Sequence, residues 1–290
     1  MFNVKRAPVW ALTFIVQGWI PVALAEETAV LNETAAPHEV YFGSVAMATP
    51  AVTHRRLSPL IKYLGEALGR PVNLKLSFDM PTVLKDVAEG TVHLVYATPV
   101  GYIRAKNSGD VRLVAKAMTK EGGSFQLMVV AKQEGSIHNI QDLAGKRFAF
   151  GDKAAVLQRA VVIGAGMPLE RLGNYAFIGD IDNIVQGVMK GEFDAGILKD
   201  TIARKWEGKG LKILLASAPM PSFNIAASRA MDDQLFTQVR EALLKLDIRN
   251  PEHAKILQAM DEHYTGFAPV KDQEYDVVRK LIKPLEKSDI

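Results

Sequence analysis

Short strand-like runs alternate with longer helix-like segments along most of this chain, and this alternation constrains the fold more than any other feature. From about His38 onward, β-branched and aromatic runs are separated by segments with helical periodicity. Such alternation is typical of βα units that build a mainly parallel sheet. In the first series we expect strands at Val40–Val45, Val72–Leu76, His93–Tyr96 and Val111–Ala117, with helices near Arg55–Leu68, Pro81–Glu89 and Pro99–Lys106.

A second series of the same kind follows the first. Its expected strands are Phe125–Ala131, Arg147–Phe150, Asn174–Ile178, Asp194–Leu198 and Leu211–Ala216, and its expected helices are Ala154–Gly164, Ile181–Lys190 and Thr201–Trp206. The chain then returns through a strand at Asn224–Ser228 to three helix-like stretches, near Asp232–Leu246, Pro251–Glu262 and Asp272–Glu286.

Turn residues mark the two places where the chain passes from one series to the other. Gly122-Gly123-Ser124 ends the first series, and Pro219-Met220-Pro221 ends the second. We therefore predict a two-lobed α/β protein in which each lobe is a mainly parallel sheet flanked by helices and two strands form a hinge. The expected boundaries are a signal peptide at 1–25, lobe 1 at 26–123 and 223–290, and lobe 2 at 124–222.

The first twenty-five residues predict export. Lys5 and Arg6 precede an apolar run at Val9–Val22, and Ala23-Leu24-Ala25 places small residues before Glu26. This is the pattern of a secretory signal peptide cleaved after Ala25. The alternatives are a membrane anchor or an amphipathic start of the domain, but the run is shorter than the roughly twenty residues of a spanning helix. We expect a periplasmic protein without a direct membrane anchor.

Charge and cysteine content exclude several classes of partner and chemistry. The formal net charge is +3, of which Lys5 and Arg6 supply two charges, so no field strong enough to hold nucleic acid is expected. The chain has no cysteine. A disulfide framework, a thiolate nucleophile and a lipid-accepting cysteine are therefore excluded.

Motifs for catalysis and for metal or cofactor binding are missing from the sequence. The six histidines lack zinc-ligand spacing, and Gly164-Ala165-Gly166 ends an expected helix instead of opening one. Neither a Gly-x-Ser-x-Gly elbow nor a phosphate loop with Gly-Lys-Ser/Thr occurs. We predict no catalytic residues, no metal and no cofactor, so an enzyme is the minority hypothesis.

One strand-to-helix junction in each series is a candidate for ligand binding. In open α/β sheets, ligands bind beyond the carboxyl ends of strands, where helix N-termini offer free N–H groups. The first junction is Tyr96–Tyr102, in which Thr98 caps the helix, Pro99 suits its first turn and Tyr102 returns to the same mouth. The second is Phe148–Ala155. Each junction is either ordinary capping or part of a site that faces an interlobe cleft.

Motifs along almost the whole of Glu26–Ile290 resemble the periplasmic phosphonate-binding family, the solute-binding components of phosphonate, phosphate and phosphite importers. The similar segments are Tyr41–Gly43, Asp86–Leu94, Thr98-Pro99-x-x-Tyr102, Asp142–Asp152, Val188–Gly196 and Ser217–Pro221. The resemblance implies a type II bilobed periplasmic binding protein that works with an ABC permease.

The ligand loop departs from the pattern of that family. Where its members usually have Ser-Thr-Ser, this chain has Ala155, Val156 and Leu157, and Ile181 stands before Asp182 where a histidine is common. Burying a dianion without matched donors is costly. The ligand is therefore expected to be a small organic molecule or a less charged oxyanion, not a typical phosphonate. The alternative is that these apolar residues pack in the core.

The polar groups left at the ends of the strands are the expected ligand contacts. Backbone amides would contribute at Ala154 and Ala155, whereas Lys153 fits a solvated loop lysine equally well. The full expected set is Thr98, Tyr102, Ser124, Lys153, Ala154, Ala155, Asp182 and Lys199.

Two roles follow for a binding protein of this kind. In the first, the lobes close over a small-molecule or oxyanion ligand and deliver it to an ABC permease at the inner membrane. In the second, the same fold reports the ligand to a sensor histidine kinase, because a changed anion loop is compatible with recruitment as a sensor.

Overall fold

The computed structural model describes residues 38–45, 49–109, 111–179 and 181–286, all within one unit, Ala35–Ile290. The expected signal peptide lies outside the described residues. Within these ranges, none of the helices combines the length and the apolar character that crossing a membrane requires.

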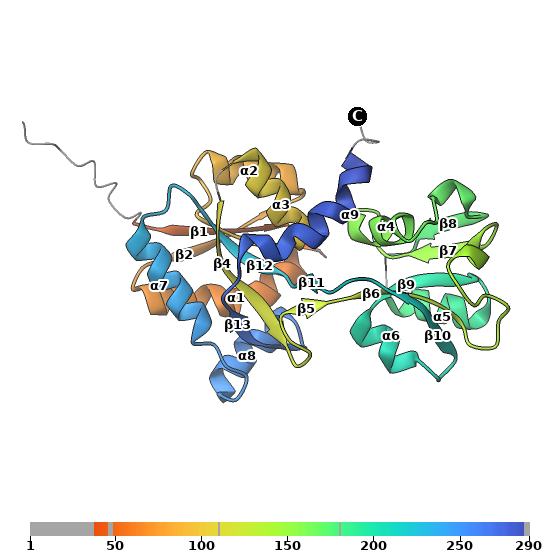
Figure 1. Ribbon diagram of the computed structural model, residues 1–290. Coiled ribbons are helices and arrows are strands. Elements are labelled where there is room, and N and C mark those ends of the chain that lie inside the picture. The colour runs from red at the N-terminus through yellow and green to blue at the C-terminus, as the bar shows by residue number, and fades with distance from the viewer. Residues whose placement is uncertain (1–37, 46–48, 110, 180, 287–290) are drawn as a thin grey trace, which may run out of the picture. The chain divides into compact units, whose positions relative to one another are not determined.

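A six-stranded mixed sheet carries the first series of elements. Its strand order is β13-β4-β12-β3-β1-β2, and β2, β1 and β3 are parallel neighbours (Figure 1). Strand β12 runs antiparallel to both β3 and β4, and β13 runs antiparallel to β4. The bounds are β1 Val40–Val45, β2 Val72–Ser77, β3 Leu94–Ala97, β4 Val111–Thr119, β12 Asn224–Ser228 and β13 Tyr264–Ala268.

A five-stranded mixed sheet carries the second series, in the order β10-β6-β9-β7-β8. Strands β8, β7 and β9 are parallel neighbours, whereas β6 runs antiparallel to both β9 and β10. The bounds are β6 Leu127–Lys132, β7 Arg147–Phe150, β8 Asn174–Phe177, β9 Ala195–Lys199 and β10 Leu211–Ala216.

The expectation of an α/β fold is confirmed, but the sheets are mixed instead of mainly parallel. The reason lies in the two crossings. Strands β4 and β10 leave their sheets at the edge where the βα strands end. The next strands, β6 and β12, enter the other sheet from the corresponding edge and therefore run against its βα strands.

The two crossing segments pair with each other. Strand β5, Ser124–Phe125, and strand β11, Met220–Pro221, form an antiparallel two-stranded ribbon with Phe125 opposite Met220. Gly122 precedes the ribbon with φ +112°, a conformation that favours glycine. The sequence predicted both crossings at these turn residues. The domain boundaries drawn from them stay a prediction.

Helices cover both faces of the six-stranded sheet. Along β3, Leu94 and Tyr96 pack into a core with the helices on one face, while Val95 and Ala97 pack into another core on the opposite face. The first group of helices is α1 Pro50–Leu68, α7 Asp233–Leu244 and α8 Pro251–Met260, and the second is α2 Met80–Ala88 and α3 Pro99–Ser108.

The five-stranded sheet is covered in the same way. Along β6, Leu127 and Val129 belong to the core that includes α4, and Met128 and Val130 belong to the core under α5 and α6. This alternation follows from the period of two in a strand. The helices are α4 Val156–Gly164, α5 Ile181–Lys190 and α6 Asp200–Trp206; short 3₁₀ turns are η1 Gln141–Leu143 and η2 Leu169–Arg171.

The C-terminal stretch differs from its prediction as a single helix. It divides into a 3₁₀ turn, η3 Asp272–Tyr275, and helix α9 Asp276–Glu286, which packs against both α3 and α4. The sequence reading also missed β13, a short strand that contains Gly266 and has an irregular register with β4. It started α1 five residues late, because Thr49 caps this helix and Pro50 occupies its first turn.

Candidate functional site

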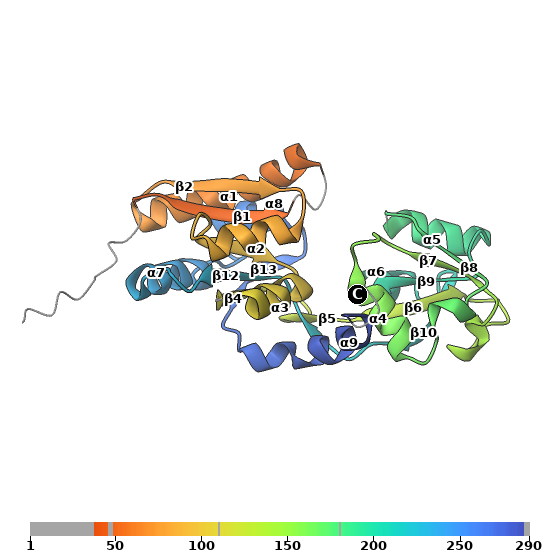
Figure 2. The same cartoon turned by 90° about the horizontal axis from the view of Figure 1, so that it is seen from above.

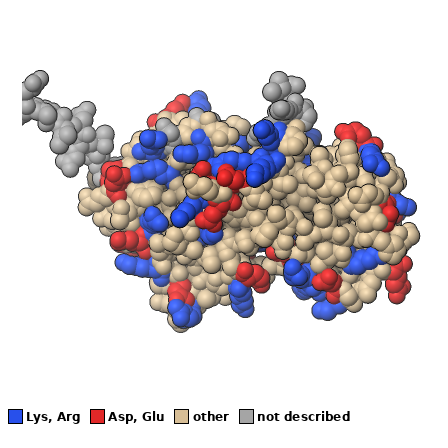
Figure 3. Space-filling view, in the orientation of Figure 1, with Lys and Arg blue, Asp and Glu red and all other residues tan. Residues whose placement is uncertain are grey.

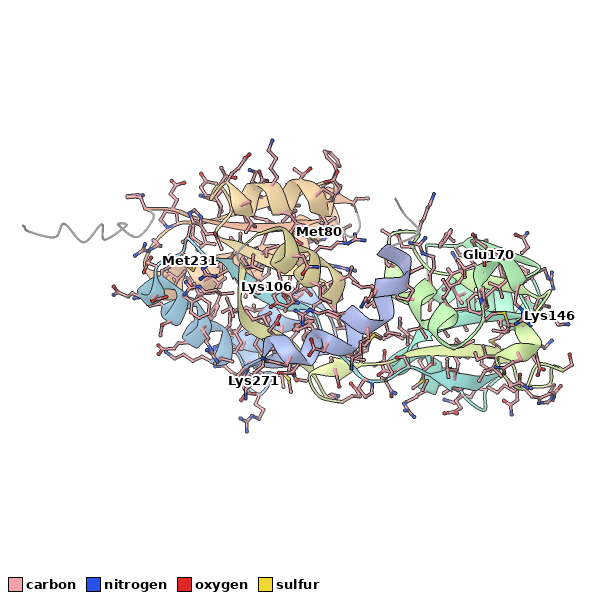
Figure 4. All side chains as sticks on the ribbon, turned by 45° about the horizontal axis from the view of Figure 1, so that its top comes forward. Met80, Lys106, Lys146, Glu170, Met231 and Lys271 are labelled. Carbon is pink, nitrogen blue, oxygen red and sulfur yellow. The ribbon has the colours of Figure 1, made fainter. Side chains whose placement is uncertain are left out.

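The junction between β3 and α3 forms as the sequence predicts. Thr98 is the N-cap residue, and its Oγ1 accepts a hydrogen bond from the amide of Gly101 at 3.0 Å. Gly101 has no side chain to separate the cap from α2: an added Cβ would lie 2.7 Å from Cε of Met80, at the start of α2 (Figure 4). The Thr98 hydroxyl is thus already engaged in capping.

The side chain of Tyr102 does not point back to the end of β3, where the sequence predicted it. Its side chain is only 1% exposed, its ring centroid lies 4.6 Å from that of Tyr275, and its hydroxyl donates to Oδ1 of Asp272 at 2.5 Å. Burial, together with the neighbouring Asp272 carboxylate, raises the pKa of the Tyr102 hydroxyl well above its usual value. The expected position is therefore corrected: the side chain of Tyr102 joins α3 to the C-terminal segment.

At the junction between β7 and α4, three backbone amides already donate hydrogen bonds to nearby acceptors. Oδ1 of Asp152 accepts from the amide of Ala154 at 2.8 Å, and the carbonyl of Asp152 accepts from the amide of Ala155 at 2.9 Å. Oε1 of Gln158 accepts from the amide of Gly151 at 2.7 Å. Ala155 is the N-cap residue of α4 and has no side-chain cap.

This geometry changes the sequence interpretation of the loop. Ala154 and Ala155 were expected to offer free amides, but both amides donate to Asp152, so a ligand would have to displace these bonds. Leu157 is buried in the core, in agreement with the alternative that the apolar residues pack inside, while Ala155 and Val156 are half-buried. Lys153 is exposed in the loop.

The remaining predicted contacts lie on separate elements. Asp182 is exposed in the first turn of α5. Lys199 ends β9, is half-buried, and places its Nζ 5.9 Å from the ring centroid of Phe125 on β5. Ser124 is exposed on β5. The structure therefore brings Lys199 close to the β5–β11 ribbon that carries Ser124.

A cavity of about 370 Å³ lies beside this ribbon. The turn after β4, the ribbon itself, the start of α6 and the residue before β13 all contribute to it. Its lining residues are Glu121, Ser124, Phe125, Gln126, Asp200, Thr201, Arg204, Pro219 and His263. Of the predicted contacts, Ser124 lines the cavity and Lys199 lies next to it, whereas Thr98, Lys153, Ala154, Ala155 and Asp182 are not among its lining residues.

Charges of both signs surround the cavity. The pKa of Glu121 is lowered by hydrogen bonds from the backbone of Glu121 and from the side chain of Thr119, and by the nearby His263 and Lys199. This carboxylate is therefore ionised at neutral pH. Asp200 accepts from the amides of Gln126 at 2.9 Å and of Thr201 at 2.8 Å. Arg204 contributes a positive charge on the exposed side of α6.

Sequence reasoning missed most of this cavity. Glu121, Asp200 and His263 are more than sixty residues apart from one another along the chain, and none belongs to a motif. Only their closeness to the predicted crossings and strand ends could have indicated them. Within the described ranges, no three His, Cys, Asp or Glu side chains are grouped so as to hold a metal ion. Basic and acidic side chains are interspersed over the face shown in Figure 3.

Comparison with solved structures shows the fold. XAC2383 from Xanthomonas citri, bound to ATP, is 16% identical with a TM-score of 0.72, over 87% of this chain and 98% of that chain. PhnD1 from Prochlorococcus marinus, in complex with methylphosphonate, is 18% identical with a TM-score of 0.69, over 87% and 99%. PA3383 from Pseudomonas aeruginosa, a binding protein component of an ABC phosphonate transporter, is 15% identical with a TM-score of 0.66, over 88% of each chain.

Two sheets of this topology, joined by a ribbon, define the class: the fold is that of the type II periplasmic binding proteins. A family model described as "ABC transporter, phosphonate, periplasmic substrate-binding protein" matches residues 42–275. The chain therefore belongs to this family, as its motifs indicated, and is a periplasmic substrate-binding component of an ABC transporter.

Proposed function

We propose that this protein binds a small dipolar solute, not a phosphonate dianion, and delivers it to an ABC permease after its two sheets close about the β5–β11 ribbon. The observation that carries this proposal is that three backbone amides of the turn between β7 and α4 already donate hydrogen bonds within the protein. Asp152 and Gln158 accept hydrogen bonds from the backbone amides of residues 151, 154 and 155.

A dianion in this turn would meet a double penalty. The amides of residues 151, 154 and 155 are already engaged, and the Asp152 carboxylate would repel it because like charges in one site disfavour each other. Phosphate and phosphonate groups need several matched hydrogen-bond donors to offset their loss of hydration. A neutral or positively charged part of a solute has neither difficulty.

The cavity beside the ribbon supports a solute with both signs of charge. Glu121 and Asp200 suit an ammonium or hydroxyl group, while Arg204 and the neighbouring Lys199 suit a single negative group. Ser124 adds a hydroxyl at the ribbon. Ser124 and Lys199 are the contacts we retain for the solute, with Thr98, Lys153 and Asp182 proposed at strand and helix ends that a closed form brings to it.

Isothermal titration and thermal-shift measurements over a matched panel test the proposal. The panel pairs methylphosphonate, phosphate and phosphite with a zwitterionic sulfonate, an alkylsulfonate and neutral amino acids. A solute at one hundred times its Kd stabilises the folded state by about 2.7 kcal/mol, which a thermal shift detects. We expect dipolar solutes to bind and the phosphorus oxyanions to bind weakly or not at all; methylphosphonate binding tighter than every dipolar solute would refute the proposal.

Delivery to a permease is the role that membership of the family supports. None of the described features favours docking onto a sensor kinase. Loss of solute uptake when the gene is deleted, with transcription unchanged, would agree with transport.

A further inference from the structure

The C-terminal segment makes a third connection between the two sheets, in addition to the two strands of the ribbon. Residues 272–286, comprising η3 and α9, follow directly after Lys271 (Figure 4). They contact α3, which packs on the six-stranded sheet, and α4, which packs on the five-stranded sheet. Figures 1 and 2 both show α9 beside α4. We call residues 272–286 the strap.

Hydrogen bonds to the Asp272 carboxylate attach the first half of the strap to α3. Oδ1 of Asp272 accepts from the hydroxyl of Tyr102 and from Nη2 of Arg279, each at 2.5 Å, and Nη1 of Arg279 also donates to Oδ1 of Asp276 at 2.7 Å. Tyr275 is completely buried beside Tyr102. These partners hold the start of the strap in one place on the six-stranded sheet.

A second anchor ties the strap to a central strand. Lys116 on β4 pairs with Glu274 in η3. Because β4 leads directly into β5, this ion pair lies one turn before the ribbon on the same chain segment. The anchored half therefore follows the six-stranded sheet.

The second half of the strap packs on α4 through apolar side chains. Val278 and Ile282 are buried in the same core as Val161 of α4, and a Cβ added at Gly164 would lie 3.4 Å from Cδ2 of Leu281. A groove of about 470 Å³ runs along this contact, lined among others by Val161, Leu215, Val277 and Leu281. The contact is close at Gly164 but leaves room at its side.

Helix α4 begins at the turn that departs from the family pattern. Its N-terminal end follows Asp152–Ala155, and its C-terminal end at Gly164 contacts the strap. Any rotation of one sheet against the other about the ribbon must either carry α4 along with the strap or slide α4 beneath it. The strap thus contacts helices of both sheets away from the ribbon.

We propose that the strap limits the movement of the two sheets about the β5–β11 ribbon and positions α4, with Tyr102, Asp272 and Arg279 as positioning residues. This inference rests on the closing movement in the proposed function. Tyr102, which the sequence indicated as a ligand contact, acts here through the strap and not by touching the solute.

Inter-label distances test the strap without any solute. Because the chain contains no cysteine, Lys62→Cys with Lys190→Cys places two spin labels, one on α1 and one at the end of α5. Both positions are exposed, and they belong to helices on different sheets. The width of the measured distance distribution reports the range of movement between the sheets.

Two variants loosen opposite ends of the strap in this labelled protein. Leu281→Gln places an amide against α4, and Tyr102→Phe removes the hydroxyl that holds Asp272. Lys283→Gln is the matched control, because Lys283 is exposed on the same helix. We expect both test variants to widen the distribution roughly two-fold, since a lost contact in a two-state element shifts its populations, and the control to match the wild type.

Distributions that coincide with the wild type in folded test variants would overturn the proposal. Circular dichroism establishes folding, and if Leu281→Gln does not fold, the conservative Tyr102→Phe decides the outcome. A solute panel without a dipolar binder would refute the proposed function but leave this result intact. Unchanged distributions with a dipolar binder would instead refute the strap alone.

Discussion

The two strand-to-helix junctions follow strands at different places in their sheets, and they treat their backbone donors in different ways. Strand β3 lies beside the antiparallel strand β12, whereas β7 lies between the parallel strands β8 and β9. At the β3–α3 junction, Thr98 caps the helix in the usual manner through the amide of Gly101. At the β7–α4 junction, the N-cap Ala155 has no capping side chain, and Asp152 and Gln158 supply the acceptors instead. A strand-to-helix junction therefore does not by itself imply a ligand chemistry, because what matters is which N–H groups remain free.

The largest expected effect concerns the first junction and the position of Tyr102. Tyr102→Ala should lower the free energy of unfolding by about 3–5 kcal/mol, since a large buried ring is lost and a cavity remains. Urea unfolding followed by circular dichroism measures this change. Tyr175→Ala is the control, because this tyrosine is 39% exposed and should cost much less. A loss below about 1 kcal/mol for Tyr102→Ala would contradict its role in the core and would agree with a contact to the solute.

The next effect concerns the second junction. Asp152→Ala with Ala155→Ser should free the amide of Ala154, remove a repelling charge and add a hydroxyl donor. Affinity for methylphosphonate should rise about ten-fold, equivalent to about 1.4 kcal/mol, as measured by isothermal titration. Glu134→Ala removes an exposed acid in the turn after β6, changes the net charge equally and should have no such effect. An unchanged affinity in the double variant would mean that this turn does not meet the ligand.

A smaller effect distinguishes the two ways of capping. Thr98→Ala should destabilise the protein by about 1 kcal/mol, because the amide of Gly101 loses its acceptor. Thr237→Ala on α7 is the matched control, since its hydroxyl only bonds back to the carbonyl of Asp233 in an exposed helix. Equal unfolding midpoints for the two variants would show that the Thr98 cap adds nothing.

The smallest effect is the pH dependence of the strap anchor. Burial opposes the ionisation of Asp272, but hydrogen bonds from Tyr102 and Arg279 outweigh it and lower the pKa of this carboxyl. A lowered pKa in the folded state means that the stabilisation is complete above the ordinary carboxyl value of about 4 and is lost as the pH falls below it. Asp272→Asn should therefore flatten the acid side of a plot of unfolding free energy against pH.

The control for this pH profile is Asp276→Asn, which removes an exposed carboxylate that also pairs with Arg279 but does not meet Tyr102. Its acid limb should stay close to that of the wild type. Identical acid limbs for Asp272→Asn and the wild type would show that the anchor does not depend on the charge of Asp272.

Most strands and helices could be predicted because their signals are local. Val40–Val45, Arg147–Phe150 and Asn224–Ser228 end where the sequence predicts, since apolar alternation and flanking turn residues define them. The strand Tyr264–Ala268 could not be found, because its short run with a central glycine carries no alternation and its pairing with β4 is a long-range contact. The antiparallel direction of β6 and β12 could not be predicted either, because the two crossings decide it and not the local sequence of these strands.

The candidate site was predicted only in part for the same reason. Ser124 lies at a turn that the sequence marks, and Lys199 at a strand end. The amides of Ala154 and Ala155 were counted as free, because side-chain acceptors such as Asp152 and Gln158 show themselves only once the turn is folded.

The sequence by itself determined the alternation of strands and helices, the order of the two series, the crossings at Gly122–Ser124 and Pro219–Pro221 and the cap at Thr98, because each depends on neighbours within a few positions. Tertiary structure alone decided that Tyr102 meets Asp272, 170 residues further along the chain, and that Glu121, Asp200 and His263 share one cavity. Those contacts arise from packing between elements, so no local pattern of residues encodes them.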